Sequence, residues 1–332
     1  MRKRDIERLL VGDVADTESL YDLHDEADAP ASERMRRDRG DELVVRSRGR
    51  LTEQARARLA RQREAAIADD GPPEGDRWSS WGDADERGPE PFPDWLIPEL
   101  AAVDVELGTL KTGKEADVFA VRRAVPGTDR SCLMAAKRYR GADHRLFHRD
   151  AGYLEGRRVR ASREMRAMRR RSDFGRNLIA QRWAVAEFAA LGQLWAAGAP
   201  VPYPVQRIGS ELLLEFIGEP DGTAAPRLVQ LRPDPAELAE LWRQLVDAMV
   251  TLARAGYAHG DLSAYNVLVH RGQVVMIDLP QMVDVVANPQ GIAFLERDVR
   301  AVSGWFAARG LPRDAADPDR MVELLLGEIG LR

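Results

Sequence analysis

Cysteine is nearly absent from this sequence, because Cys132 is the only one among 332 residues. No intramolecular disulfide can form, and this suits a reducing compartment. The chain also lacks an apolar run of about 18 or more residues, and its start, Met1 to Asp5, is not followed by an apolar signal core. A basic excess is missing too, since the net charge is −5 at pH 7. These absences predict a soluble cytoplasmic protein with no membrane segment, and the overall charge gives no case for nucleic-acid binding.

Lysine is scarce as well: of 49 basic residues only four are lysine. Three of them, Lys111, Lys114 and Lys137, fall within one short span. Lysine is a compact point charge that can approach phosphate closely, and arginine does not replace it equally well there. In a chain that otherwise uses arginine, this clustering favours phosphate-binding positions, although so few residues can also cluster by chance.

Residues 1–92 differ in composition from the rest. The stretch 34–63 is dense in arginine, an acidic segment rich in Pro and Gly follows, and large apolar residues are few. We predict a charged, largely disordered extension with one charged helix over 51–66. This extension is either a solvated tail without a specific role or an arm that binds a partner. Three tryptophans are candidates for anchoring its end to the folded domain: Trp78, Trp81 and Trp95.

The folded domain is expected over 93–332, with an N-lobe at about 93–216 and a C-lobe at about 217–332. Apolar alternation and turn residues predict strands first and helices later, which indicates an α+β, two-lobed, kinase-like fold. The predicted strands cover 103–110, 118–121, 132–137, 212–217, 266–269 and 273–278, and the predicted helices cover 179–197, 235–256, 291–309 and 318–329.

The segment from His259 to Asn266 carries the strongest chemical pattern. Asp261 is followed five positions later by Asn266, and Asp278 ends an apolar run downstream. In phosphoryl transfer, one Asp positions the attacking hydroxyl while an Asn and a second Asp hold Mg²⁺ against the phosphates. The alternative is an ordinary turn-rich loop, since Gly, Asp, Ser and Asn all favour turns. The agreement of both spacings favours catalytic Asp261 with Asn266 and Asp278 as metal ligands.

Upstream residues add the parts that would bind a nucleotide. Lys137 ends a predicted strand, as a phosphate-binding lysine does in kinases, and Glu187 on the next helix is the candidate partner for its ammonium group. The alternatives are an ordinary surface lysine and an ordinary helix-surface acid. Gly113 and Lys114 lie in a strand–turn–strand segment that, taken alone, is also compatible with a plain β-turn. In front of Lys137, this segment is expected to form a phosphate-covering loop.

Together these segments resemble the RIO atypical protein kinases over about residues 93–308. The loop Thr112–Phe119 resembles the family's S-T-G-K-E-A-x-V-Y, and Trp183–Phe188 resembles its W-A-x-x-E-[FM] helix. The catalytic loop resembles H-x-D-L-S-x-[YF]-N, with Gly260 where the family commonly has Ala. The remaining matches are 212–217 to the hinge, Ile277–Gln281 to I-D-x-[SP]-Q, and Phe294–Asp298 to F-L-x-R-D.

The resemblance implies a small bilobal kinase domain without the activation segment of ordinary protein kinases. It implies ATP with Mg²⁺ or Mn²⁺, transfer to Ser of a protein substrate including autophosphorylation, and for some members an ATPase cycle. Asp261 would be catalytic, Asn266 and Asp278 would bind the metal, and Lys137 would bind phosphate. The hinge residues Glu215 and Ile217 would contact the nucleotide.

Two other functions remain open. The arginine-rich segment 138–182 would suit contact with RNA or the ribosome in a nucleotide-switched assembly factor, or it would simply be a mobile charged loop. A small-molecule phosphotransferase also uses an H-x-D-x-x-x-x-N loop.

Overall fold

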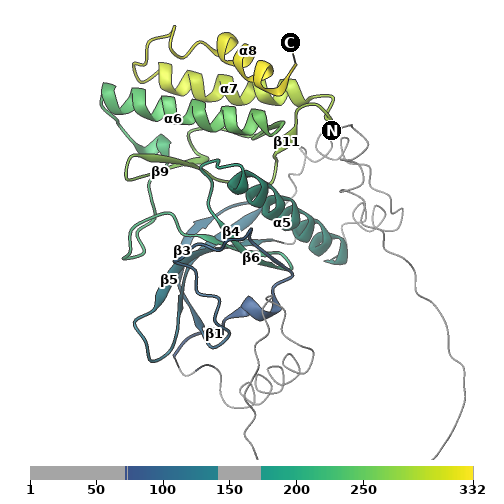
Figure 1. Ribbon diagram of the computed structural model, residues 1–332, viewed down its shortest axis with the longest axis vertical. Helices are drawn as coiled ribbons and strands as arrows, with labels where there is room; N and C mark the ends of the chain where they lie inside the picture. Colours follow the sequence, from purple (N-terminus) through teal and green to yellow (C-terminus); the bar gives the residue numbers. More distant parts are fainter. Residues whose placement is uncertain (1–71, 73, 141–172, 332) are drawn as a thin grey trace, which may run out of the picture. The chain divides into compact units, whose positions relative to one another are not determined.

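The computed structural model describes residue 72 and residues 74–140 and 173–331 (Figure 1). The predicted charged helix over 51–66 and most of the arginine-rich segment lie outside these residues. In the part of the chain that is described, no helix combines the length and the apolar character needed to cross a membrane.

A seven-stranded antiparallel sheet forms the N-lobe, in the order β1-β3-β4-β5-β7-β6-β2. Alternate residues of its central strands are buried, as expected where one face of a sheet covers a core. Met134 and Ala136 on one such strand are fully buried in a cluster with Val205 and Leu213. The strands are β1 (Arg77–Trp78), β2 (Glu86–Arg87), β3 (Val103–Thr112), β4 (Ala116–Ala124), β5 (Ser131–Tyr139), β6 (Pro204–Ile208) and β7 (Glu211–Glu215).

The sheet begins before the predicted domain boundary at residue 93. β1 pairs with β3 at one edge of the sheet, and β2 pairs with β6 at the other edge. In the chain, the short helix η1 (Ser80–Asp83) follows β1 and precedes β2. Two-residue strands carry no periodicity, so the sequence pattern could not reveal them. The expectation that tryptophans anchor this segment is confirmed for Trp81, which is 8% exposed in the sheet cluster, and Trp95 packs against the same cluster.

Helix α5 (Asp173–Ala196) contacts β5, β6 and β7. In Figure 1 it lies along the sheet. Its buried residues Ala180, Ala184, Phe188 and Leu191 recur at helical spacing, which places one stripe toward the sheet and the core. The helix begins earlier than the predicted 179. It ends before Gly198, whose φ of 78° suits a residue without a side chain.

Three helices form most of the C-lobe: α6 (Pro235–Arg254), α7 (Gly291–Ala307) and α8 (Pro318–Ile329). Asp234 and Asp317 cap α6 and α8 through bonds from backbone N–H groups of the first turn. Short strands join the helices, namely β8 (Tyr257–Ala258), β9 (Val267–His270), β10 (Gln273–Met276) and β11 (Val283–Asp284), and η2 (Leu228–Gln230) precedes α6. The α+β, two-lobed architecture is confirmed, and β10 ends two residues before Asp278, on the loop that continues toward α7.

Candidate active site

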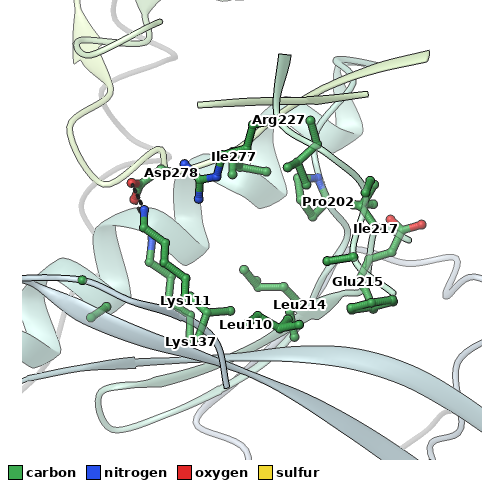
Figure 2. A pocket seen from close by; sticks show the side chains of 18 of the residues that line it. Leu110, Lys111, Lys137, Pro202, Leu214, Glu215, Ile217, Arg227, Ile277 and Asp278 are labelled. Carbon is green, nitrogen blue, oxygen red and sulfur yellow. Dashed lines mark hydrogen bonds and ion pairs between the residues drawn. The ribbon is translucent and has the colours of Figure 1, made fainter. Parts of the chain in front are cut away.

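A cavity of about 670 Å³ lies between the sheet and the loops that lead into the C-lobe (Figure 2). Volumes of roughly 300–1,000 Å³ are typical of small-molecule sites. Its walls are mainly apolar, with Leu110, Val118, Ala135, Leu214 and Ile277 among the lining residues. Seven of the residues that the sequence nominates line it: Gly113, Lys114, Lys137, Glu187, Glu215, Ile217 and Asp278.

Lys137 bridges two carboxylates at the charged end of the cavity. Its Nζ donates to Oε1 of Glu187 at 2.6 Å and to Oδ1 of Asp278 at 2.7 Å. Burial alone would lower the pKa of Lys137, but the two carboxylates outweigh burial and raise this pKa. The positive charge of Lys137 in turn lowers the pKa of Asp278 to about 2. The predicted ion pair between Lys137 and Glu187 is therefore present, and it extends to the candidate metal ligand.

Two further contacts hold Glu187 in place. Its Oε2 accepts a hydrogen bond from the hydroxyl of Tyr139, and its Oε1 also accepts from the backbone N–H of Leu279 at 3.2 Å. Glu187 is 1% exposed, and each of its carboxylate oxygens has at least one donor. One side chain thus joins β5, α5 and the loop after Asp278. Burial and the neighbouring carboxylate of Glu187 raise the pKa of Tyr139 well above 10, so Tyr139 stays a donor.

Asp278 lies in a backbone conformation that few residues with a side chain adopt. Its φ is 70°, in the left-handed region. Such conformations cluster at functional sites, where the surrounding structure enforces them. Here the turn directs the carboxylate toward the lysines of the sheet: Oδ1 faces Lys137 and Oδ2 lies 3.9 Å from Nζ of Lys111.

Asn266 and Asp261 lie on the loop between β8 and β9 rather than in the cavity lining. The side-chain Nδ2 of Asn266 donates to the backbone oxygen of Asp261 at 2.9 Å, so the amide oxygen is the atom left to act as an acceptor. The backbone oxygen of Asn266 accepts from the N–H of Ile277 at 2.9 Å, next to Asp278. The loop and the candidate metal ligand are thereby tied together. A carboxylate and an amide oxygen are ligands that fit a hard divalent cation such as Mg²⁺.

Asp298 on α7 fixes the backbone on both sides of Asp261. Its carboxylate accepts from the N–H of Gly260 at 2.7 Å and from the N–H of Leu262 at 2.8 Å, and Asp298 is 3% exposed. Arg297 donates to the backbone oxygen of Gly260. The peptide groups that carry Asp261 are therefore held from α7.

Gly260 is needed for this loop geometry. Its φ is 85°, and a Cβ built on it would lie 2.1 Å from the backbone oxygen of Gln281. Alanine, which is common at this position in the family that the sequence resembles, would clash here unless the backbone moved. Glycine at this position, where the family commonly has alanine, therefore suits the local backbone of this chain.

The loop around Gly113 forms a tight turn. The N–H of Gly113 donates to the backbone oxygen of Ala116 at 3.0 Å, and a Cβ at Gly113 would approach this oxygen to 2.9 Å. The N–H of Gly113 is thus used within the turn, and Lys114 of the same segment also lines the cavity.

At the other end of the cavity, the connector after β7 has the features of a hinge. The N–H of Glu215 donates to the backbone oxygen of Tyr203 at 2.8 Å, and the carboxylate of Glu215 accepts from the N–H of Tyr203 at 3.0 Å. The carbonyl of Ile217 accepts from the N–H of Ala225 at 2.9 Å. Glu215 and Ile217 therefore line the cavity while holding the connector in shape.

Four further residues shape this site: Lys111, Tyr139, Arg227 and Asp298. The sequence marks Lys111 as one of the clustered lysines and Asp298 as the last residue of a family motif, but it assigns neither a specific contact. Tyr139 and Arg227 gave no signal, because their roles depend on contacts with segments distant in the sequence. Arg227 lines the cavity and donates to the backbone oxygen of Tyr265 at 2.5 Å.

The chain is similar to known proteins. The family model of the RIO domain matches residues 128–320. The RIO-type serine/threonine-protein kinase Rio1 of Haloferax volcanii is 35% identical over 228 residues, covering 69% of this chain and 71% of that protein. Rio1 of Thermoplasma acidophilum is 35% identical over 150 residues, covering 45% of this chain and 75% of that protein. The crystal structure of the Rio2 kinase from Chaetomium thermophilum matches with a TM-score of 0.43 and 22% identity, over 68% of this chain and 69% of that one.

Proposed function

The chain belongs to the RIO family and is a RIO-type serine/threonine-protein kinase, and from this premise we propose the roles of its site residues. In this proposal it transfers the γ-phosphoryl group of Mg-ATP to a serine hydroxyl of a protein, its own chain included. The observation that carries the assignment is the ammonium of Lys137, held between Glu187 and Asp278 at the charged end of a mainly apolar cavity.

The cavity suits a nucleotide lying along its length. Leu110, Val118, Ala135, Leu214 and Ile277 give apolar contacts for a base, near the connector that holds Glu215 and Ile217. At the opposite end, Lys137 and Lys114 supply positive charge for the phosphates. This polarity, apolar at one end and cationic at the other, matches the chemistry of ATP.

Asn266 and Asp278 are the residues that would hold Mg²⁺ or Mn²⁺. Both offer oxygen ligands, and the backbone hydrogen bond between Ile277 and Asn266 keeps their segments adjacent. A divalent cation bound there neutralises charge that develops on the transferred phosphoryl group. The low pKa of Asp278, about 2, keeps its carboxylate ionised and ready to bind a cation at neutral pH.

Asp261 is the proposed catalytic residue. Its carboxylate would orient the attacking serine hydroxyl and accept its proton as the new oxygen–phosphorus bond forms. The bond between the γ-phosphorus and the bridging oxygen breaks in the same transfer, and ADP leaves. Asp298 keeps the two flanking peptide groups in place, so the position of this carboxylate is set by α7 rather than by the loop alone. Positioning of this kind matters, because a misplacement of about 1 Å can cost about 100-fold in rate.

The test compares wild type with Asp261→Asn in phosphoryl transfer from labelled ATP in the presence of Mg²⁺. Asp247→Asn on α6 is the matched control, since Asp247 pairs only with exposed Arg243 in the described contacts. Wild type and the control should transfer or hydrolyse phosphate at equal rates, and Asp261→Asn should lose at least about 100-fold. Equal activity in wild type and Asp261→Asn would refute the assignment.

A further inference from the structure

We propose that Lys111 is a second phosphate-binding lysine of the nucleotide site, one that the fold aims into the cavity by a bulge in β3. This inference rests on the proposed function, because it requires the cavity to hold a nucleotide.

Lys111 and Lys137 lie in one row across the sheet. In the pairing register, Lys111 of β3 is opposite Val118 of β4, and Val118 is opposite Lys137 of β5. Directly paired residues of antiparallel strands project to the same face. All three residues line the cavity, so both lysines approach it from the same side of the sheet.

A bulge places Lys111 in this row. The pairing of β3 with β4 shifts between Thr109 and Lys111, which leaves Leu110 as an extra residue without an opposite partner. In a regular strand neighbouring residues point to opposite faces, yet both Leu110 and Lys111 line the cavity. Without the extra residue, Leu110 would stand opposite Val118 and Lys111 would point to the other face of the sheet.

Both lysines reach the same carboxylate from this row. Nζ of Lys137 lies 2.7 Å from Oδ1 of Asp278, and Nζ of Lys111 lies 3.9 Å from Oδ2 (Figure 2). Lys137 is also held by Glu187, whereas Asp278 is the one carboxylate within 4.0 Å of Lys111 among the described ion pairs. Lys137 is therefore fixed by two strong contacts, and Lys111 by one long contact.

This difference in attachment suggests how Lys111 works. Its side chain is 41% exposed, so it can move without breaking a buried contact. The proposed role of Asp278 in holding a divalent cation brings a competing positive charge to the carboxylate that Lys111 faces. Lys111 then pairs with the phosphates of the nucleotide, and it adds a second ammonium group beside Lys137. Lys114 and Arg227 also line this cavity, so four cationic residues surround it.

The experiment measures dissociation constants of adenosine, ADP and ATP by calorimetry, with Mg²⁺ and with EDTA. The variants are Lys111→Met and Lys111→Gln, which remove the charge and keep most of the side-chain length. Arg122→Met is the matched control, because Arg122 is an exposed cation on the neighbouring strand β4 that does not line the cavity.

Both Lys111 variants should bind ATP and ADP about 10-fold more weakly than wild type, while adenosine, which has no phosphate, keeps its affinity. Arg122→Met should bind all three as wild type does. Unchanged ATP and ADP affinity in both Lys111 variants, or an equal fall for adenosine, would overturn the inference. If wild type itself bound ATP no more tightly than adenosine, the proposed function would fail instead.

Discussion

Replacement of Asp298 by Asn tests whether α7 positions the catalytic loop. The carboxylate accepts two backbone hydrogen bonds, at 2.7 and 2.8 Å, from the residues on either side of Asp261. Asn keeps the size of the side chain but has one acceptor oxygen, and its NH₂ group would face the second N–H. One buried N–H then loses its partner, and the other loses the charge of its acceptor.

The magnitude follows from these two bonds. A hydrogen bond to a charged group contributes roughly 1.5–3 kcal/mol, and a buried donor without a partner costs roughly 1–3 kcal/mol. We expect Asp298→Asn to lower the free energy of unfolding by about 2–4 kcal/mol. A domain with about 5–15 kcal/mol of stability remains folded after such a loss. Because Asp261 would no longer be held, kcat should fall about 100-fold.

The assay combines urea unfolding with ATP turnover and nucleotide binding. Glu296→Gln on the same helix is the matched control, since Glu296 pairs with Arg300 one turn away and should cost only about 0.2–0.5 kcal/mol. Asp298 does not line the cavity, so the affinity for ATP should be unchanged in both variants. Asp298→Asn with the kcat and stability of wild type would show that α7 does not position the loop.

Three further predictions each concern one residue. Tyr139→Phe removes the hydroxyl that donates to Glu187 and should lower the free energy of unfolding by about 1.5–3 kcal/mol in urea; no change would show that the bond contributes nothing. Gly260→Ala should reduce turnover and stability together, since its Cβ would meet the backbone oxygen of Gln281, and a fully active variant would contradict that contact. Burial raises the pKa of Tyr203 to about 12, so the folded state retains this proton more strongly than the unfolded state, whose pKa is near 10. The difference in free energy of unfolding between wild type and Tyr203→Phe should therefore be largest below pH 10 and should shrink as the pH rises toward 12. A difference that does not change with pH would contradict the raised pKa.

Most residues of the candidate site could be nominated from the sequence, because phosphoryl-transfer chemistry demands particular residue types at fixed spacings. Asp261 and Asn266 lie five positions apart on one loop, and Asp278 follows a strand, so local sequence alone indicates them. The pairing of Lys137 with Glu187 was predictable for a related reason, because a lysine at a strand end and an acid on the next helix form a recognisable combination.

Other features depend on contacts that no local pattern encodes. The two-residue strands β1 and β2 form only because longer strands already present open edges to them. The direction of Lys111 depends on one extra residue, Leu110, in the pairing with β4, and a strand with a bulge looks much like one without it in sequence. The role of Asp298 depends on how α7 packs against a loop 36 residues away.

The central claim is that Asp261, Asn266, Asp278 and Lys137 form a site for phosphoryl transfer from ATP to serine. Mass spectrometry of the purified chain after incubation with Mg-ATP tests it most directly. The account predicts that wild type gains phosphoryl groups on serine and releases ADP, while Asp261→Asn does neither. Equal phosphorylation of both proteins, or no phosphoryl gain and no ADP from wild type, would contradict it.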